Sequence, residues 1–445
     1  MTEASAASTS RSGGRSFALE IGSIGLAALA LRVAYVLGAK RNDGIDITIG
    51  EKGGDQYYYS LAAEALAEGR GFVVPWFDTV AQPAADHPPL TALAAAPASL
   101  LPGWSVLPQR LTMCVIGALA VVVIGYLGRH VGGHRAGLVA GALAAVAPAL
   151  WINDGLVMSE SLGALTVAGV LLALYRWRDR PSVQRAAVVG ALCGFAVLAR
   201  SEAALLAPIT IAPMLIWSGD LAGAQRLRQI GVAAGCTVLV LVPWVVPNLL
   251  RFEEPVLLST NDGLTLYGAN CYPGVYQGDG IGLWTLECPL AEDTTGLDQS
   301  EVSSLYRDRA FETIGDHTDR LPAVVAARVG RVWSFYRPEQ MISYNTGEGR
   351  ETWASRAAVL GYYLLLVPAA IGGWLLHRRK VSLWPLLSQF VNVTLVAGLF
   401  YGLTRFRISA EVALIVLAAV TVAALWDRWR PPAKPPVADT QAVPV

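Results

Sequence analysis

The sequence predicts an all-α polytopic membrane protein, and three observations support this class. Of its 445 residues, 54% are hydrophobic and 15% are charged, against roughly 25% charged residues in an ordinary soluble domain. Ten apolar stretches have, or come near, the length of about 20 residues that a spanning helix needs. The basic residues between them fall on one side if the helices alternate across a membrane. An ordinary soluble enzyme is therefore excluded.

The first apolar stretch has no small-residue cleavage site directly after it, which predicts a retained helix and not a removed signal peptide. The third, fifth and sixth stretches are short for a span. In order, the ten predicted helices cover 17–37, 107–127, 136–151, 155–175, 186–198, 203–217, 230–250, 357–376, 383–401 and 408–426.

Short cytoplasmic loops retain Lys and Arg, so the side that carries the basic loops is predicted to be the cytoplasm. These loops are 129–135, 176–185, 226–228, 377–380 and 428–434. Both ends of the chain join that side. We expect 1–16 and the Pro-rich 431–445 to be disordered cytoplasmic tails, which leaves 17–430 as one membrane domain.

Two long segments, 39–109 and 251–355, remain on the extracytoplasmic side. Loops beyond about 15 residues usually carry structure of their own, and both segments show helical periodicity. The helices either lie at the outer membrane surface or pack within a small extracytoplasmic domain. Cys271 and Cys288 are the cysteines outside the predicted helices, and an oxidising exterior would permit a disulfide between them.

Overall charge and cysteine pattern restrict the function. Lys and Arg number 34 and Asp and Glu also number 34, so no excess of positive charge indicates a nucleic-acid partner. The five cysteines form no CxxC motif and no Cys/His cluster, which argues against a zinc or thiol redox site. The acidic residues form no obvious ligand set for a divalent ion, and no cofactor is expected.

Several charged residues fall at membrane depth, where each costs roughly 2.5 to 3.5 kcal/mol on insertion scales. By the predicted topology all lie near the outer surface, so they favour one polar cavity that opens away from the cytoplasm. Taken singly, each charged side chain could instead extend to the membrane interface, with its aliphatic part in the lipid and its charged end in water, or it could pair with a neighbour. The residues are Arg32, Glu160, Arg200, Glu202, Arg405, Arg407 and Glu411.

The first outer segment adds two candidates. Asp55 opens a Tyr- and Ala-rich helix, and its default role is an N-cap that accepts a backbone N–H. His87 stands before two prolines, where extended geometry and a turn are the default.

The order of these motifs resembles the GT-C membrane glycosyltransferases, in particular the protein O-mannosyltransferase and aminoarabinose-transferase group. The resemblance covers most of 17–426, although many relatives have a second acid where this chain has Gln56, and ten helices is fewer than in many members. It rests on Asp55 and its helix, the His87–Leu90 element, the run Val157–Leu162, the junction Ala199–Glu202, the runs Val242–Asn248 and Ser259–Asn270, and Thr404–Arg407.

This resemblance implies transfer of a sugar from a polyprenyl-phosphate donor to an extracytoplasmic acceptor, usually with inversion. Asp55 would be the general base. Arg405 and Arg407, with Arg200 behind them, would bind the donor phosphate. Five further residues would orient the sugar or acceptor, although Asn261 and Asn270 could simply shape their loop: Glu160, Glu202, His87, Asn261 and Asn270.

Two other functions remain open. A transporter or flippase of a lipid-linked sugar or another anion would also bury charges, but transporters place their sites near the midplane between repeats, and no repeat is visible here. A non-catalytic scaffold of a cell-envelope complex would use the outer loop for docking. The sequence leaves open which sugar is moved and whether a protein, lipid or glycan accepts it.

Overall fold

The computed structural model describes residues 2–43, 54–74, 82–101, 106–217 and 221–429. Within these ranges the chain is helical and forms no strand; Val73 and Pro83 make an isolated β-bridge. The all-α membrane class is thereby confirmed. The predicted tail 431–445 lies outside the described residues.

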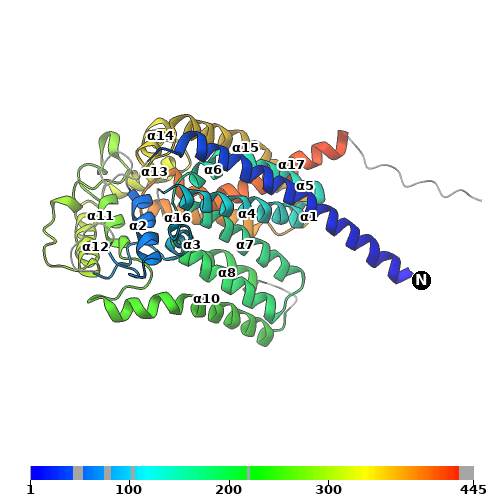
Figure 1. Ribbon diagram of the computed structural model, residues 1–445, viewed down its shortest axis with the longest axis horizontal. Helices are drawn as coiled ribbons and strands as arrows, with labels where there is room; N and C mark the ends of the chain where they lie inside the picture. Colours follow the sequence, from blue (N-terminus) through cyan, green and yellow to red (C-terminus); the bar gives the residue numbers. More distant parts are fainter. Residues whose placement is uncertain (1, 44–53, 75–81, 102–105, 218–220, 430–445) are drawn as a thin grey trace, which may run out of the picture.

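A long helical bundle makes up most of the protein (Figure 1). All ten predicted stretches contain helical structure. The bundle elements are α1 (Thr2–Tyr35), η1 (Val36–Lys40), α4 (Leu107–Gly132), α5 (His134–Val146), α6 (Pro148–Asp154), α7 (Glu160–Asp179), α8 (Val183–Ala199), η2 (Ser201–Leu205), η3 (Leu206–Ile211), α9 (Ala212–Ile216), α10 (Gly223–Arg251), α15 (Thr352–Arg378), α16 (Trp384–Leu399), η6 (Thr404–Arg407) and α17 (Ile408–Trp429).

The structure changes several predicted boundaries. α1 begins at Thr2 and not at residue 17, so the predicted tail is helical from Thr2 onward. The predicted helix 136–151 is broken before Pro148, with a bend of 53° between α5 and α6, because proline cannot donate the helical hydrogen bond. In the described part of the chain five helices are long and apolar enough to span a membrane, or six with this bent pair. The chain is a multi-pass membrane protein.

α17 lies in the middle of the bundle, and every residue in 408–421 is buried. α10 lies at the periphery, where it packs on α8. Gly190 and Gly194 of α8 permit this contact, since a Cβ on Gly190 would lie 2.0 Å from the carbonyl oxygen of Ala233. Small residues four positions apart are the usual means of close helix packing in membranes.

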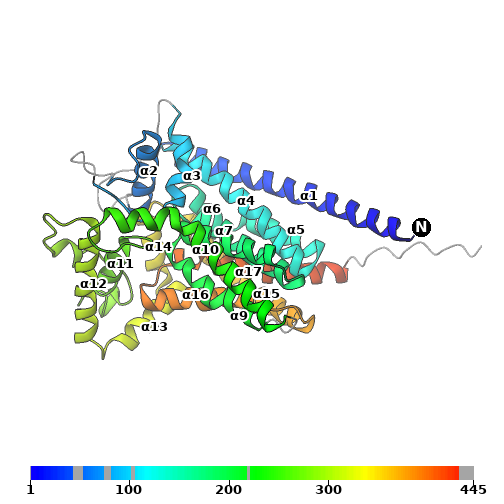
Figure 2. The same cartoon turned by 90° about the horizontal axis from the view of Figure 1, so that it is seen from below.

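The two long segments meet at one end of the bundle, and the N-terminal end of α1 and the C-terminal end of α17 lie at the other (Figures 1 and 2). This arrangement agrees with the predicted alternation, which puts the tails opposite the long loops. The elements at the loop end are α2 (Gly54–Ala67), α3 (Leu90–Ser99), α11 (Asn261–Ala269), η4 (Gly278–Gly280), η5 (Pro289–Ala291), α12 (Gln299–Asp316), α13 (Leu321–Val332) and α14 (Pro338–Gly347).

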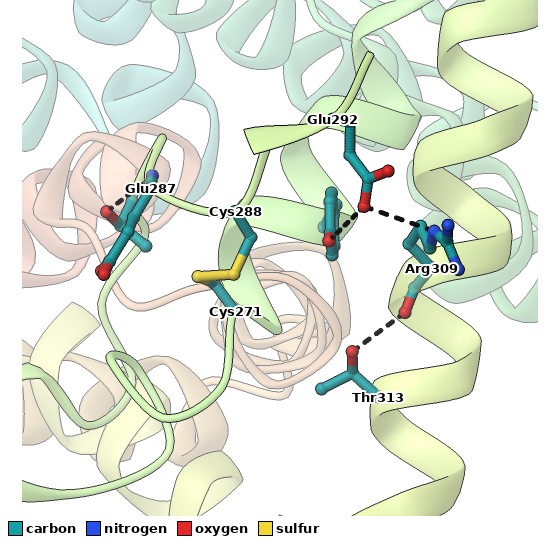
Figure 3. Close-up of a disulfide and its surroundings, with 8 residues drawn as sticks. Cys271, Glu287, Cys288, Glu292, Arg309 and Thr313 are labelled. Atoms are coloured by element: carbon teal, nitrogen blue, oxygen red, sulfur yellow. Dashed lines mark hydrogen bonds and ion pairs between the residues drawn. A yellow bond between two sulfur atoms is a disulfide. The ribbon is translucent and has the colours of Figure 1, made fainter. Parts of the chain in front are cut away.

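The amphipathic outer helices pack within the protein. Tyr58 and Ala62 of α2 are buried in a cluster with Met113 of α4, and α12 packs so closely on α11 that a Cβ on Gly263 would clash with the backbone of Ser303. These contacts are compatible with both predicted arrangements, at the membrane surface or within a small extracytoplasmic domain. A disulfide joins Cys271 to Cys288, close to the Glu292 and Arg309 ion pair (Figure 3).

Candidate functional site

A buried carboxylate stands at the centre of the charged residues. Glu160 opens α7 and is fully buried. Its Oε1 lies 3.1 Å from Arg200 Nη1, 3.5 Å from Arg350 Nη2 and 3.8 Å from Arg405 Nε. Neither carboxylate oxygen has a hydrogen bond of good geometry within the described residues. Glu160 is therefore held by electrostatic attraction to the three arginines and not by hydrogen bonds. This carboxylate brings together three distant parts of the sequence.

Asp55 and Arg405 meet directly. Arg405 Nη2 donates to Asp55 Oδ2, although 350 positions separate the two residues in the chain, and Arg405 Nη1 donates to Glu348 Oε1 at 2.9 Å. The side chain of Asp55 keeps 23% of its surface exposed, so a solvent-borne or membrane-borne molecule can reach it. The predicted convergence of the first outer segment with the Thr404–Arg407 element is thus present.

His87 lies on the other side of Asp55. His87 Nε2 is 3.4 Å from Asp55 Oδ1 and 3.4 Å from Asp86 Oδ2, while Nδ1 is 3.3 Å from Asn261 Nδ2. The ring stacks on Tyr59 with centroids 4.9 Å apart. His87 and Asn261 therefore belong to the surroundings of Asp55.

These neighbours set the ionisation of Asp55. Burial raises the pKa of Asp55, but Arg405 and His87 outweigh it and hold that pKa well below its usual range. Burial lowers the pKa of His87, and the charges of Asp55 and Asp86 outweigh this and raise it. The pKa of Asp86 is raised, chiefly by burial. Asp55 is consequently an ionised carboxylate at neutral pH, able to accept hydrogen bonds.

Arg405 and Arg407 line a first, small cavity. Arg407 points away from Asp55: its Nε donates to Glu411 at 2.6 Å, its Nη1 to Ser334 Oγ at 3.0 Å, and its guanidinium lies over Tyr362. Three arginines and one acid line the cavity, and each arginine is paired with a carboxylate: Arg350 with Glu348, Arg405 with Asp55 and Glu348, and Arg407 with Glu411. Its lining residues with polar side chains are Asn153, Asn345, Arg350, Ser355, Thr404, Arg405, Arg407 and Glu411.

Arg200 and Glu202 line a second cavity, which is also small. Arg200 Nε donates to Glu202 at 2.5 Å and Nη1 to Ser159 Oγ at 3.0 Å. The structure therefore separates Arg200 from the cavity of Arg405 and Arg407, and Glu160 lies against arginines from both cavities.

Two candidates lie elsewhere. Asn270 is fully buried in the outer loop, where its Oδ1 accepts from Tyr276 at 2.8 Å and from Arg328 at 3.0 Å; this is the loop role considered from the sequence. Arg32 is paired with Asp154 of α6 at 2.6 Å, and both side chains are buried. The partners of its guanidinium are Asp154 and the carbonyl groups of Ala28, Ala144 and Ala145, and it lines neither cavity, contrary to expectation.

Sequence reasoning missed Glu348 and Arg350. Arg350 donates to Glu348 and, at 2.9 Å, to Asn153. Gly349 between them has a φ of 92°, and a Cβ there would lie 2.8 Å from Gln56 Nε2, so only glycine fits without strain. A run of charged residues directly before the predicted helix 357–376 was the available signal. Within the described residues no three His, Cys, Asp or Glu side chains are grouped so that they could hold a metal ion.

The chain resembles known proteins in part of its sequence and in its fold. Residues 86–249 match the family model described as dolichyl-phosphate-mannose-protein mannosyltransferase. No curated protein matches the chain in sequence. Among solved structures, the chain is similar to the oligosaccharyltransferase AglB from Archaeoglobus fulgidus in complex with an inhibitory peptide and a dolichol-phosphate, with a TM-score of 0.55, 16% identity and coverage of 92% of this chain and 50% of the other.

Two further structures are similar. The apo form of the Archaeoglobus fulgidus oligosaccharyltransferase gives a TM-score of 0.53 at 14% identity and covers 92% of this chain and 51% of the other. ArnT from Cupriavidus metallidurans bound to undecaprenyl phosphate gives 0.44 at 14% identity, with 92% and 78% covered; that score is too low to support a conclusion. The chain thus spans about half the length of the oligosaccharyltransferase it matches. At these identities the similarity establishes the fold.

Proposed function

Because the chain has the fold of the GT-C superfamily of membrane glycosyltransferases, we propose that it is itself such an enzyme. It moves a sugar from a polyprenyl-phosphate donor to an acceptor on the extracytoplasmic side of the cell membrane, with inversion at the anomeric carbon. Its partners are the lipid donor, the surrounding membrane lipids and the acceptor, with no nucleic acid.

One observation carries this proposal: Asp55, from the first outer segment, pairs with Arg405, from the turn before the last helix, and Arg405 lines the first cavity. A glycosyl transfer from a phosphate donor needs a base for the acceptor hydroxyl and a cationic site for the leaving phosphate. In this proposal Asp55 is the base, and Arg405 with its neighbouring arginines binds the leaving phosphate.

In the proposed reaction the acceptor oxygen forms a bond to the anomeric carbon, and the bond from that carbon to the phosphate oxygen breaks. The electron pair leaves with the phosphate, and the acceptor proton goes to Asp55. A positioned carboxylate typically contributes about 10² to 10⁴ in rate. His87, whose raised pKa favours its protonated form, orients Asp55 by its contact with Oδ1.

The donor phosphate binds in the first cavity, where Arg405, Arg407 and Arg350 converge. Arginine matches phosphate oxygens with two N–H groups at once. Arg405 is already engaged by Asp55 and Glu348, so the incoming phosphate competes for it. When the phosphate takes over the positive charge, Asp55 loses a strong counter-ion and its pKa rises toward the usual value. Donor binding in this way makes Asp55 a better base.

The extracytoplasmic assignment rests on charge distribution. The basic loop 129–135, between α4 and α5, and the basic C-terminal end of α17 belong to the end opposite the site, and short basic loops stay in the cytoplasm. The site therefore faces outward.

Replacement of Asp55 by Asn tests the proposal. The carboxyl becomes an amide of the same shape, so we expect transfer from a supplied polyprenyl-phosphate sugar to fall by at least about 10² while the protein is still made and folded. Glu64→Gln is the matched control, since it makes the same change on the same helix α2. Undiminished turnover by the Asn variant in reconstituted vesicles contradicts the role of Asp55.

A transporter or flippase remains the second candidate because of one observation. α5 and α6 form a span broken at a 53° bend, and broken helices commonly form transporter sites. A transporter would move labelled lipid-linked sugar across vesicles without releasing free polyprenyl phosphate. Formation of polyprenyl phosphate together with a glycosylated product supports the transferase instead.

A further inference from the structure

Helix α13 buries its charged residues and exposes apolar ones. Arg328 and Arg331 are 3% and 0% exposed. An amphipathic helix that borders water has the opposite distribution, with charged side chains on its outer side. The exposed residues of α13 all have apolar side chains, so its outer side suits apolar surroundings. These residues form the apolar face of α13: Pro322, Ala323, Val325 and Ala326.

Hydrogen bonds to the outer loop hold the two arginines inside. Arg328 Nη2 donates to the carbonyl of Ala269 at 2.5 Å and to Asn270 Oδ1 at 3.0 Å. Arg331 Nε donates to the carbonyl of Ile281 at 2.7 Å. A buried charge is costly unless it is hydrogen-bonded, so these bonds determine which side of α13 faces the protein. Rotation of the helix would break them, and the apolar face is therefore fixed outward.

Helix α12 has the ordinary distribution, although the sequences of both helices are amphipathic. Its buried residues include Ser303 and Ala310. Phe311 is 62% exposed, but it lies among exposed charged residues. The outer side of α12 therefore suits water, and the two consecutive helices differ in the surroundings that they fit. The exposed charged residues of α12 are Asp308, Arg309, Glu312 and Asp316.

Helix α13 crosses the outer end of α16, at the edge of the molecule (Figure 2). A Cβ on Gly398 would lie 3.6 Å from Val325 Cγ1, and a Cβ on Gly402 would lie 2.7 Å from Arg331 Cβ. Between them, Arg328 Nη1 donates to the carbonyl of Gly398 at 3.2 Å. From Val325 to Arg331 the helix advances about 9 Å at 1.5 Å per residue, while these contacts stay at the end of α16 and directly after it. The helix thus lies across α16 and not alongside it.

The exposed side of α16 leads to the apolar face of α13. α16 has 16 residues and is about 24 Å long at 1.5 Å per residue, whereas the hydrocarbon core of a membrane is about 30 Å thick. A span of this length alone leaves a hydrophobic mismatch. α13, about 10 Å across, lies at the outer end and supplies the missing apolar surface. On α16 every fourth residue is exposed and apolar: Leu387, Val391, Leu395 and Leu399.

We propose that α13 is inserted into the outer leaflet of the membrane, flat across the outer end of α16, with lipid acyl chains against its apolar face. Interfacial helices insert their apolar side about 5 to 10 Å into the boundary between head groups and acyl chains. Asp319 and Arg320, exposed directly before α13, mark the point where the chain leaves the water. The inference goes beyond the proposed function, because it holds for a transferase and a transporter alike.

Photo-crosslinking in a lipid bilayer tests the insertion. Val325 is replaced by p-benzoyl-L-phenylalanine in the full-length protein, which is placed in phosphatidylcholine nanodiscs and irradiated. Phe311, replaced in the same way, is the matched control, since it is an exposed apolar residue on the helix assigned to water. Leu395 of α16 is the positive control. Mass spectrometry measures the lipid adducts and locates each new bond in the acyl chain or in the head group.

We expect Val325 to give as much lipid adduct as Leu395, bonded to the acyl chain, and Phe311 to give none. Replacement of Ala326, also on the apolar face, should give the same result as Val325 and keeps the test valid if the Val325 variant does not fold. Absence of lipid adducts at both positions, bonds confined to head groups, equal adduct formation at Phe311, or a crosslink to a second copy of the chain in place of lipid overturns the insertion.

Discussion

Lys40 offers the sharpest test of how the site is held in place. Its buried ammonium donates to the carbonyl of Gly349 at 2.7 Å and pairs with Glu351 at 2.5 Å and with Asp43 at 3.1 Å. Gly349 lies between Glu348 and Arg350, which both reach the charged centre. Lys40 is therefore a positioning residue that fixes this loop from the end of the first span.

The cost of Lys40→Met can be worked out from these contacts. Methionine keeps the apolar stem buried and removes the charge. The Gly349 carbonyl then loses a buried partner, at about 1 to 3 kcal/mol. Glu351 and Asp43 are 33% and 27% exposed, so water rehydrates them and each adds no more than about 1 kcal/mol. We expect a total destabilisation of about 3 kcal/mol.

The assay combines thermal denaturation with transfer kinetics. A displacement of the loop by about 1 Å can lower kcat/KM by as much as about 10², and here the loss should lie mainly in the donor KM, because Arg350 lines the first cavity. Lys40→Arg should recover part of it. Arg356→Met removes an exposed ion pair with Glu339 at the same end of the molecule and is the control. A Lys40→Met protein that is less stable but has an unchanged donor KM refutes the positioning role.

Three further predictions follow from the same geometry. Arg405→Ala should weaken donor binding more than acceptor binding, measured as two separate KM values; equal effects argue against phosphate binding by Arg405. The raised pKa of His87 means that its charge stabilises the fold below about pH 6.5 and that this contribution is lost as the pH rises through the raised value. His87→Gln should therefore flatten the decline of thermal stability above pH 6.5, and an unaltered pH profile contradicts the contact with Asp55. Cys271→Ser removes a bridge across 17 positions, which should cost about 3 kcal/mol by loop-closure entropy; a matching loss of wild-type stability in reducing buffer, absent from the variant, is the check.

Periodicity and charge predicted most of the helices and the end at which the polar residues gather. Some predicted helix ends were wrong because they depend on single residues, which the average hydrophobicity of a stretch of sequence does not reveal. Pro148 breaks one predicted helix into α5 and α6, and α7 begins at Glu160, five residues later than expected. The helix predicted over 203–217 is present as Ser201–Ile216, and its geometry changes along η2, η3 and α9, which contain Pro208 and Pro213.

The candidate residues were predicted with mixed success. Asp55, His87, Arg405 and Glu160 do lie together, and the disulfide joins the two expected cysteines. Glu348 and Arg350 were missed because a loop has no periodicity from which the direction of a side chain can be read. Arg200 was placed with Arg405 and Arg407, yet it lines the other cavity.

The amino-acid sequence by itself determined the membrane class, because the transfer free energy of apolar side chains is additive along a helix and can be summed without knowing the neighbours. It also determined which end carries the charges, since orientation depends on loops that are short and local. Only the tertiary structure decided which charge faces which cavity. Arg200 and Arg405 contact the same oxygen of Glu160 but line different cavities. That difference depends on side-chain direction and on contacts between residues up to 350 positions apart.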